Sequence, residues 1–134
     1  MRLYIAGKYE ERFRLQLIAR HIEQETHHRV HARWLETDGF SSGNPDFRAV
    51  ENRDEAEESA IDDLDDILGC HGIIYMVYQG ASMTVGRAFE LGYAYSLGHR
   101  VFIVGEPDSI FAYLPGIQQF DTTNDLVDYL KGVR

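Results

Sequence analysis

The amino-acid sequence predicts a single α/β domain, residues 1–134, with a flavodoxin-like doubly wound fold and a five-stranded parallel sheet. Short apolar runs alternate with segments whose apolar residues recur at helical spacing, and this alternation produces right-handed crossovers between parallel strands. The runs at 72–78 and 100–105 are almost continuously apolar, as expected for strands that helices cover on both faces. A chain of 134 residues suits one core, because domains commonly span about 100–200 residues.

The first half of the chain is predicted to contain two strands and one helix. LYIAG (3–7) is an apolar run that ends in Gly7, and residues 10–25 follow with helical spacing. The second strand is expected at 30–35, and the stretch at 37–47 is rich in Gly, Ser, Asn and Pro. This loop is long for a compact domain, which makes it a candidate substrate lid. The residues expected to form the apolar face of the helix are Phe13, Leu17, Ile18, His21 and Ile22.

The second half is predicted to contain three strands and three helices. In sheets of this kind, ligands bind beyond the carboxyl ends of the strands, where the strand order reverses. The turn at 6–9 (AGKY) and the loop at 79–86 are therefore expected at the binding edge. The helices are expected at 53–69, at 85–98 and, after capping residues, at 122–132, and the strands at 72–78, 100–105 and 118–120.

The amino-acid composition limits the kinds of binding partner that are expected. Acidic residues outnumber basic ones by 22 to 13, and the net charge of −9 repels duplex nucleic acid. A small nucleoside or nucleotide is still compatible with this charge, because one helix terminus or lysine can outweigh a distant net charge. The sequence has no signal-peptide pattern and no run of about 18 apolar residues, so neither export nor a membrane partner is expected. With Cys70 as its only cysteine, the chain is predicted to be cytoplasmic.

Glu90 stands out because it lies between Phe89 and Leu91 on the predicted helix at 85–98. Two apolar stripes of this helix are expected to leave it little solvated surface. A glutamate in such surroundings is either paired or functional, because an isolated buried charge is costly. The first stripe consists of Val85, Phe89, Tyr93 and Leu97, and the second of Ala88, Leu91 and Ala94.

The run AFELGYAYSLG, which contains Glu90, resembles the helix motif of the nucleoside 2-deoxyribosyltransferase family. LYIAG, with Tyr4, resembles the opening strand of that family, and DDLDDILGCHGIIYM (62–76) resembles its acidic segment before a strand. These likenesses cover most of the chain except residues 27–52, and the helix motif is the specific part. The resemblance implies that Glu90 is the nucleophile that attacks the anomeric carbon, that Tyr4 orients it, and that Asp63 faces the base and helps to protonate it.

Glycosidic chemistry agrees with this pair of carboxylates. The bond breaks through an oxocarbenium-like state, so one carboxylate covers the anomeric carbon while an acid protonates the leaving base. Two carboxyl groups in different environments can divide these roles. Asp62 competes with Asp63 for the acid role, and the acids at 62–66 also fit a solvated helix face.

The loop before the helix departs from the family pattern. Thr84, with Ser82 beside it, occupies the place of an aspartate that binds sugar hydroxyls in the transferases, and this resembles the related deoxynucleoside 5′-monophosphate N-glycosidases, whose loop binds a phosphate. Lys8 and Arg87 would supply charge for a phosphate, as would backbone amides near Gly86. Alternatively, Arg87 is a solvated charge and Lys8 only caps a turn. The predicted substrate-binding residues are Gly7, Lys8, Ser82, Thr84, Gly86 and Arg87.

No metal or organic cofactor is predicted. His27, His28 and His31 have no accompanying cysteines, which is more typical of surface histidines than of a metal site. Segment 6–12 (AGKYEER) lacks the GxGxxG spacing of dinucleotide-binding folds. Trp34 is interpreted either as a core residue or as a side chain that stacks on a base.

The predicted activity is cleavage of the N-glycosidic bond of a (deoxy)nucleoside, with transfer of the deoxyribosyl group to another base through a glycosyl-Glu90 intermediate. Hydrolysis of a 5′-mononucleotide is the first alternative, and a non-catalytic nucleotide-binding module is the second. The presence of Tyr4, Asp63 and Glu90 together favours an enzyme, because a binding module does not need the acidic pair. The resemblance also implies a homo-oligomer in which the segment from Tyr113 to Gln119 reaches a neighbour's site.

Overall fold

The computed structural model describes residues 1–37, 48–77 and 85–134. Its strands form one parallel sheet in the order β2-β1-β3-β4-β5, with the reversal of strand order between β1 and β3. This is the strand order of flavodoxin-like domains, so the predicted fold class is confirmed. The strands are β1 (Arg2–Ala6), β2 (Arg29–Val30), β3 (Gly72–Met76), β4 (Arg100–Val104) and β5 (Gln118–Phe120).

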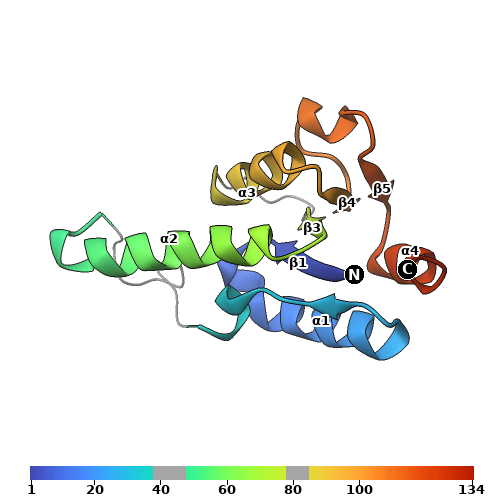
Figure 1. Ribbon diagram of the computed structural model, residues 1–134, viewed down its shortest axis with the longest axis horizontal. Helices are drawn as coiled ribbons and strands as arrows, with labels where there is room; N and C mark the ends of the chain where they lie inside the picture. Colours follow the sequence, from blue (N-terminus) through green and yellow to red (C-terminus); the bar gives the residue numbers. More distant parts are fainter. Residues whose placement is uncertain (38–47, 78–84) are drawn as a thin grey trace.

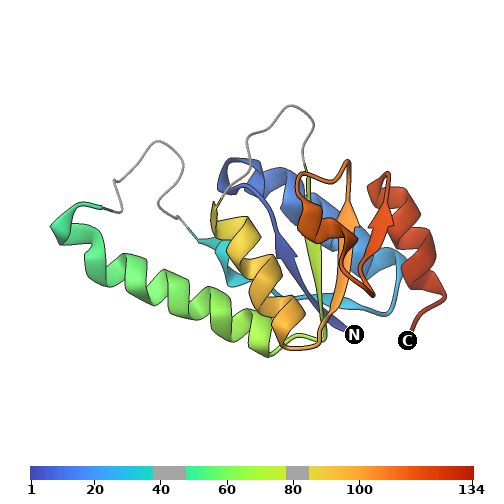
Figure 2. The same cartoon turned by 90° about the horizontal axis from the view of Figure 1, so that it is seen from above.

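Two pairs of helices cover the two faces of the sheet. On one face α2 contacts α3, and on the other α1 contacts α4 (Figure 1). The long helix α2 extends well beyond the sheet (Figure 2). The predicted capping of the last helix is confirmed, because Thr122 and Asp125 form a capping box at its start. The helices are α1 (Arg12–Glu25), α2 (Arg53–Leu68), α3 (Val85–Ser96) and α4 (Thr123–Lys131).

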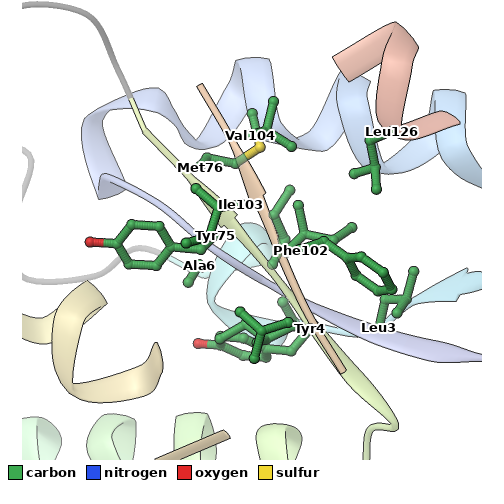
Figure 3. Packing of buried hydrophobic residues seen from close by; sticks show 14 of the residues in the cluster. Leu3, Tyr4, Ala6, Tyr75, Met76, Phe102, Ile103, Val104 and Leu126 are labelled. Carbon is green, nitrogen blue, oxygen red and sulfur yellow. The ribbon is translucent and has the colours of Figure 1, made fainter. Parts of the chain in front are cut away.

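The core lies on the central strands. Every residue of β3 is buried, and in β1 and β4 only the first residue is not. These strands read as continuous apolar runs because helices cover both of their faces. Figure 3 shows their side chains packed together, with Leu126 of α4 against the same cluster.

The second strand is present, but its predicted bounds, 30–35, are wrong. Pairing with β1 stops after Val30, and a short 3-10 helix, η2 (Arg33–Glu36), follows. Two anchors hold the chain in this turn: Asp66 on α2 accepts hydrogen bonds from both the backbone and the side chain of Arg33, and the Trp34 indole donates to the Ile5 carbonyl at 2.9 Å. These tertiary hydrogen bonds override the strand propensity of the segment.

The apolar face predicted for the first helix is wrong at two positions. Phe13 and Leu17 are 66% and 63% exposed, whereas Leu15, Ala19 and Ile22 are buried. The buried residues are four and three positions apart and form one narrow stripe against the sheet.

Parts of the predicted binding edge lie outside the described residues. These are the lid candidate from residue 38 onward and the loop that carries Ser82 and Thr84. Among the residues that are described, no helix combines the length and the apolar character needed to cross a membrane.

Candidate active site

Glu90 projects from the middle of α3 toward β1, and only part of the apolar surface predicted around it is buried. In the first predicted stripe, Val85 and Phe89 face outward, with exposed fractions of 86% and 62%, whereas Tyr93 is partly buried against the core. Leu91 and Ala94, from the other stripe, are buried, and α3 contacts β1 on this side. The prediction that Glu90 is confined is confirmed for its carboxyl group, since Oε2 is buried, but the exposed Val85 and Phe89 do not cause this burial.

Tyr4 brings its hydroxyl to the same place from the centre of β1. Its side chain is fully buried and points toward the side of the sheet that α3 covers (Figure 3). Within the described parts of the chain, neither Tyr4 Oη nor Glu90 Oε2 has a hydrogen-bond partner of normal geometry. Burial, followed by the charges of Glu90 and Asp63, raises the pKa of Tyr4 well above its ordinary value, so this phenol keeps its proton.

Burial also raises the pKa of both candidate catalytic carboxyl groups. It brings the pKa of Glu90 to about 8, with a smaller rise from the charge of Asp63 and a partial opposing effect of the nearby Tyr4 hydroxyl. The pKa of Asp63 rises to about 7, first through burial and then through the charges of Asp66 and Asp62. Tyr4, Asp63 and Glu90, far apart in sequence, therefore form one electrostatically coupled cluster, in which the two acids share a limited capacity for negative charge.

The acidic segment of α2 divides into faces with different partners. Asp66 is buried and accepts hydrogen bonds from His31 and Arg33 at 3.1 and 2.8 Å. Asp62, one turn earlier on the same face, forms a half-exposed ion pair with Arg33 at 3.4 Å. Asp63 is turned by about 100° from Asp62 and affects Tyr4 and Glu90 instead. The solvated-face interpretation is thus wrong for Asp66, whose anchoring role the sequence did not indicate.

The predicted substrate-binding residues near the strand ends are placed as follows. Gly7 and Lys8 directly follow β1 and are half-buried. Among the described residues no ion pair of Lys8 is found, and its carbonyl accepts a hydrogen bond from Glu11. Gly86 is exposed in the first turn of α3, with open space where a side chain would lie.

Arg87 is almost completely buried in the first turn of α3. Its guanidinium donates to the Met76 carbonyl at 2.5 Å and to Asp108 Oδ2 at 3.0 Å. The alternative of a solvated Arg87 is therefore wrong. Its role as a phosphate ligand stays a prediction, and a phosphate would compete with Asp108 for the same donors.

The remaining candidates have structural partners. His28 is buried and bonded to the Leu130 carbonyl, so its interpretation as a surface residue is wrong, whereas His31 bonds to Asp66. In the described ranges no cluster of His, Cys, Asp and Glu is suited to hold a metal ion. Trp34 is partly buried beside Tyr9, with 6.5 Å between the ring centroids.

Comparisons with known proteins give structural matches. No family model matches the sequence, and no curated protein does. The 2-deoxyribosyltransferase of Bacillus psychrosaccharolyticus superposes with a TM-score of 0.66 at 19% identity, covering 96% of this chain and 92% of its own. The CMP N-glycosidase of Clostridium botulinum superposes with a TM-score of 0.56 at 15% identity, covering 97% and 98%. This chain has the fold of both enzymes. The fold implied by the sequence resemblance and the fold of these structural neighbours thus agree.

Proposed function

We propose that the protein cleaves the N-glycosidic bond of a (deoxy)nucleoside and transfers the deoxyribosyl group to another base through a glycosyl-Glu90 intermediate. The observation that carries this proposal is the coupled cluster of Tyr4, Asp63 and Glu90 between α2, α3 and β1. The fold shared with a deoxyribosyltransferase and a CMP N-glycosidase supports the same chemistry.

In this mechanism each group of the cluster has one task. The ionised Glu90 attacks the anomeric carbon, and protonated Asp63 gives its proton to the departing base, whose bond electrons move onto the base. The Tyr4 hydroxyl holds the carboxylate in line by donating a hydrogen bond to it. An acceptor base then attacks the anomeric carbon of the glycosyl ester and gives its N–H proton to the Asp63 carboxylate, and Glu90 leaves as a carboxylate. Water in place of the acceptor gives hydrolysis.

The assay that tests the proposal follows free base from deoxynucleosides and their 5′-monophosphates, with and without an acceptor base. Release that depends on the acceptor and yields a new nucleoside supports transfer. Release of base and free sugar without an acceptor supports the hydrolase alternative. Binding without any release at all would leave only the non-catalytic module.

The position of Lys8 favours keeping the 5′-monophosphate as a second candidate substrate. Lys8 comes shortly after β1, at the edge where ligands of such sheets bind, and it forms no ion pair among the described residues. A charge-assisted hydrogen bond to phosphate contributes about 1.5–3 kcal/mol, roughly ten-fold or more in kcat/KM.

Lys8→Ala is therefore expected to separate the two substrates. If the protein transfers deoxyribose between free nucleosides, a nucleoside and its monophosphate should have closely similar kcat/KM values, both in the wild type and in Lys8→Ala. For a monophosphate hydrolase, the wild type should prefer the phosphate by about ten-fold or more, and Lys8→Ala should remove that preference. Lys131→Ala, a cation on α4 paired with Asp128, is the control and should change neither value.

The raised pKa values predict a bell-shaped pH profile of kcat/KM with its maximum between about 7 and 8. Activity should fall below this range because the cluster takes up a second proton and Glu90 loses its negative charge. Above it, the cluster loses both protons and Asp63 can no longer protonate the base. The two limbs belong to the coupled pair. A flat profile from about pH 5 to 9 would contradict this division of roles.

We also propose a homo-oligomer that covers the outward face of α3. Val85 and Phe89 form its apolar part, and Tyr113, 72% exposed, lies in the segment expected to reach a neighbour. Phe89→Glu should shift the protein toward monomer in light scattering, whereas Leu17→Glu, an equally exposed site on α1, should not. A wild type that is monomeric at assay concentration would contradict this proposal.

A further inference from the structure

A buried polar cluster joins the first turn of α3 to the loop that follows β4. We call it the Arg87 network, and it consists of Arg87, Asp108, Tyr75 and the Met76 carbonyl. Besides its bonds to Met76 and Asp108, the guanidinium lies 4.9 Å from the centroid of the Tyr75 ring. The Tyr75 hydroxyl donates to the same Asp108 carboxylate, at 3.1 and 3.3 Å from its two oxygens. The side chains of Arg87 and Asp108 are 1% and 17% exposed.

The chemistry of this network is better suited to orienting the joined segments than to increasing the free energy of unfolding. An ion pair taken out of water loses hydration that its attraction repays only in part, so apolar residues can stabilise such a position equally well. What the guanidinium adds is direction, because its planar fork fixes the relative orientation of every acceptor it binds. Three segments are oriented in this way: the end of β3, the start of α3 and the loop with Asp108.

The segments that the network joins are themselves close-packed. Val77, which follows β3, donates to the Val104 carbonyl at 2.8 Å. Gly105 has a φ of +104°, and a Cβ added there would lie 2.6 Å from the Val77 carbonyl oxygen. The end of β4 therefore has little freedom to shift, and the loop with Asp108 starts from this fixed point.

Glu90 lies three residues after Arg87, on the next turn of the same helix. A helix is stiff over one turn, so the anchor on Arg87 limits how α3 can slide or rotate against β1. The influence of Arg87 on Glu90 is geometric, since the pKa of Glu90 follows from burial, the Tyr4 hydroxyl and the charge of Asp63.

We propose that the Arg87 network positions α3 so that the Glu90 carboxylate faces the anomeric carbon, with Arg87, Asp108 and Tyr75 as positioning residues. This inference rests on the proposed function of Glu90. In this role Arg87 stays with Asp108 during turnover, and the charge for any substrate phosphate comes from elsewhere.

The kinetic test compares variants of Asp108. Asp108→Ala should lower kcat about 10- to 100-fold, the usual effect of displacing a catalytic group by about 1 Å, with little change in KM. Asp108→Asn keeps an acceptor for Arg87 and Tyr75 and should recover much of the loss. Equal kcat values in wild type and Asp108→Ala would overturn the proposal.

A tyrosine pair supplies the matched control. Tyr75→Phe removes one hydroxyl from the network at the carboxyl edge of the sheet. Tyr129→Phe removes the hydroxyl that accepts from Arg100 at 2.7 Å, at the other end of β4. Both variants should lower Tm to a similar extent, but only Tyr75→Phe should lower kcat. If kcat falls in both in proportion to Tm, the network contributes stability and the proposal is wrong.

Titration of the Glu90 carboxyl by ¹³C NMR gives a result that needs no activity. A displaced α3 changes the distance of Glu90 from Tyr4 and Asp63, so its titration midpoint should move in Asp108→Ala and stay constant in Tyr129→Phe. A moved midpoint in a protein that releases no base would support positioning and reject the proposed function. An unmoved midpoint would reject positioning, whether or not the protein is an enzyme.

Discussion

Glu90→Gln is expected to lower base release by a factor on the order of 10⁴–10⁶ and to leave the fold intact. The amide cannot form the glycosyl ester, and it matches the shape of the protonated carboxyl group. Because burial raises the pKa of Glu90 to about 8, most of the folded protein has a proton on Glu90 at neutral pH, and the reacting form is the minor one in which the proton lies on Asp63. Glutamine therefore introduces no new buried charge, and Tm should not fall. Single-turnover base release and thermal unfolding measure the two effects.

Glu58→Gln is the matched control, since Glu58 is an exposed glutamate of α2, and its activity should equal that of the wild type. A nucleoside with fluorine at C2 of the sugar slows breakdown of the glycosyl ester by destabilising the oxocarbenium-like state. Incubation with this compound should add the mass of the sugar to wild-type protein and leave Glu90→Gln unmodified. Normal turnover by Glu90→Gln, or an adduct on another residue, would refute the mechanism.

The sequence predicted the central fold well because that part depends on local patterns. Continuous apolar runs predicted β3 and β4, and the capping residues at the beginning of 122–132 predicted the start of α4. The extent of the second strand was predicted wrongly because hydrogen bonds from Arg33 to Asp66 decide its end, and these join residues distant in sequence. A local pattern carries no signal for such contacts.

In the candidate site, too, local patterns were predictable and contacts between distant residues were not. The motif around Glu90 predicted the helix α3, but Val85 and Phe89, which were expected to help to bury Glu90, face outward. Apolar residues on two sides of a helix do not reveal which side meets the sheet. The network of Tyr75, Arg87 and Asp108 had no signal in the sequence, because its members become neighbours only when β3, α3 and the loop after β4 pack together.

Asp63→Asn should lower kcat for cleavage about 10²- to 10⁴-fold, with the largest loss for bases that leave reluctantly. A nucleobase of low pKa departs as an anion without help, whereas one of high pKa needs the proton that Asp63 supplies. The dependence of log kcat on the pKa of the leaving base should therefore become steeper in the variant. The measurement is kcat for a series of nucleosides with graded bases.

The pH profile of Asp63→Asn should change in a defined direction. Its alkaline limb should disappear, because no proton donor remains to be lost. The remaining limb belongs to Glu90 alone, and its midpoint should lie below about 8, because removing the charge of Asp63 removes one cause that raises the pKa of Glu90. The remaining rise from burial keeps this limb above the ordinary range of a glutamate.

Asp62→Asn is the control that the fold of α2 provides. Asp62 is adjacent in sequence but turns toward Arg33, so its loss weakens only a half-exposed ion pair and should leave the leaving-group dependence unchanged. If Asp63→Asn slowed all bases equally, Asp63 would only maintain the site. If Asp62→Asn steepened the dependence instead, the general acid would be Asp62, and α2 would have to rotate by about 100° on substrate binding to present it to Glu90.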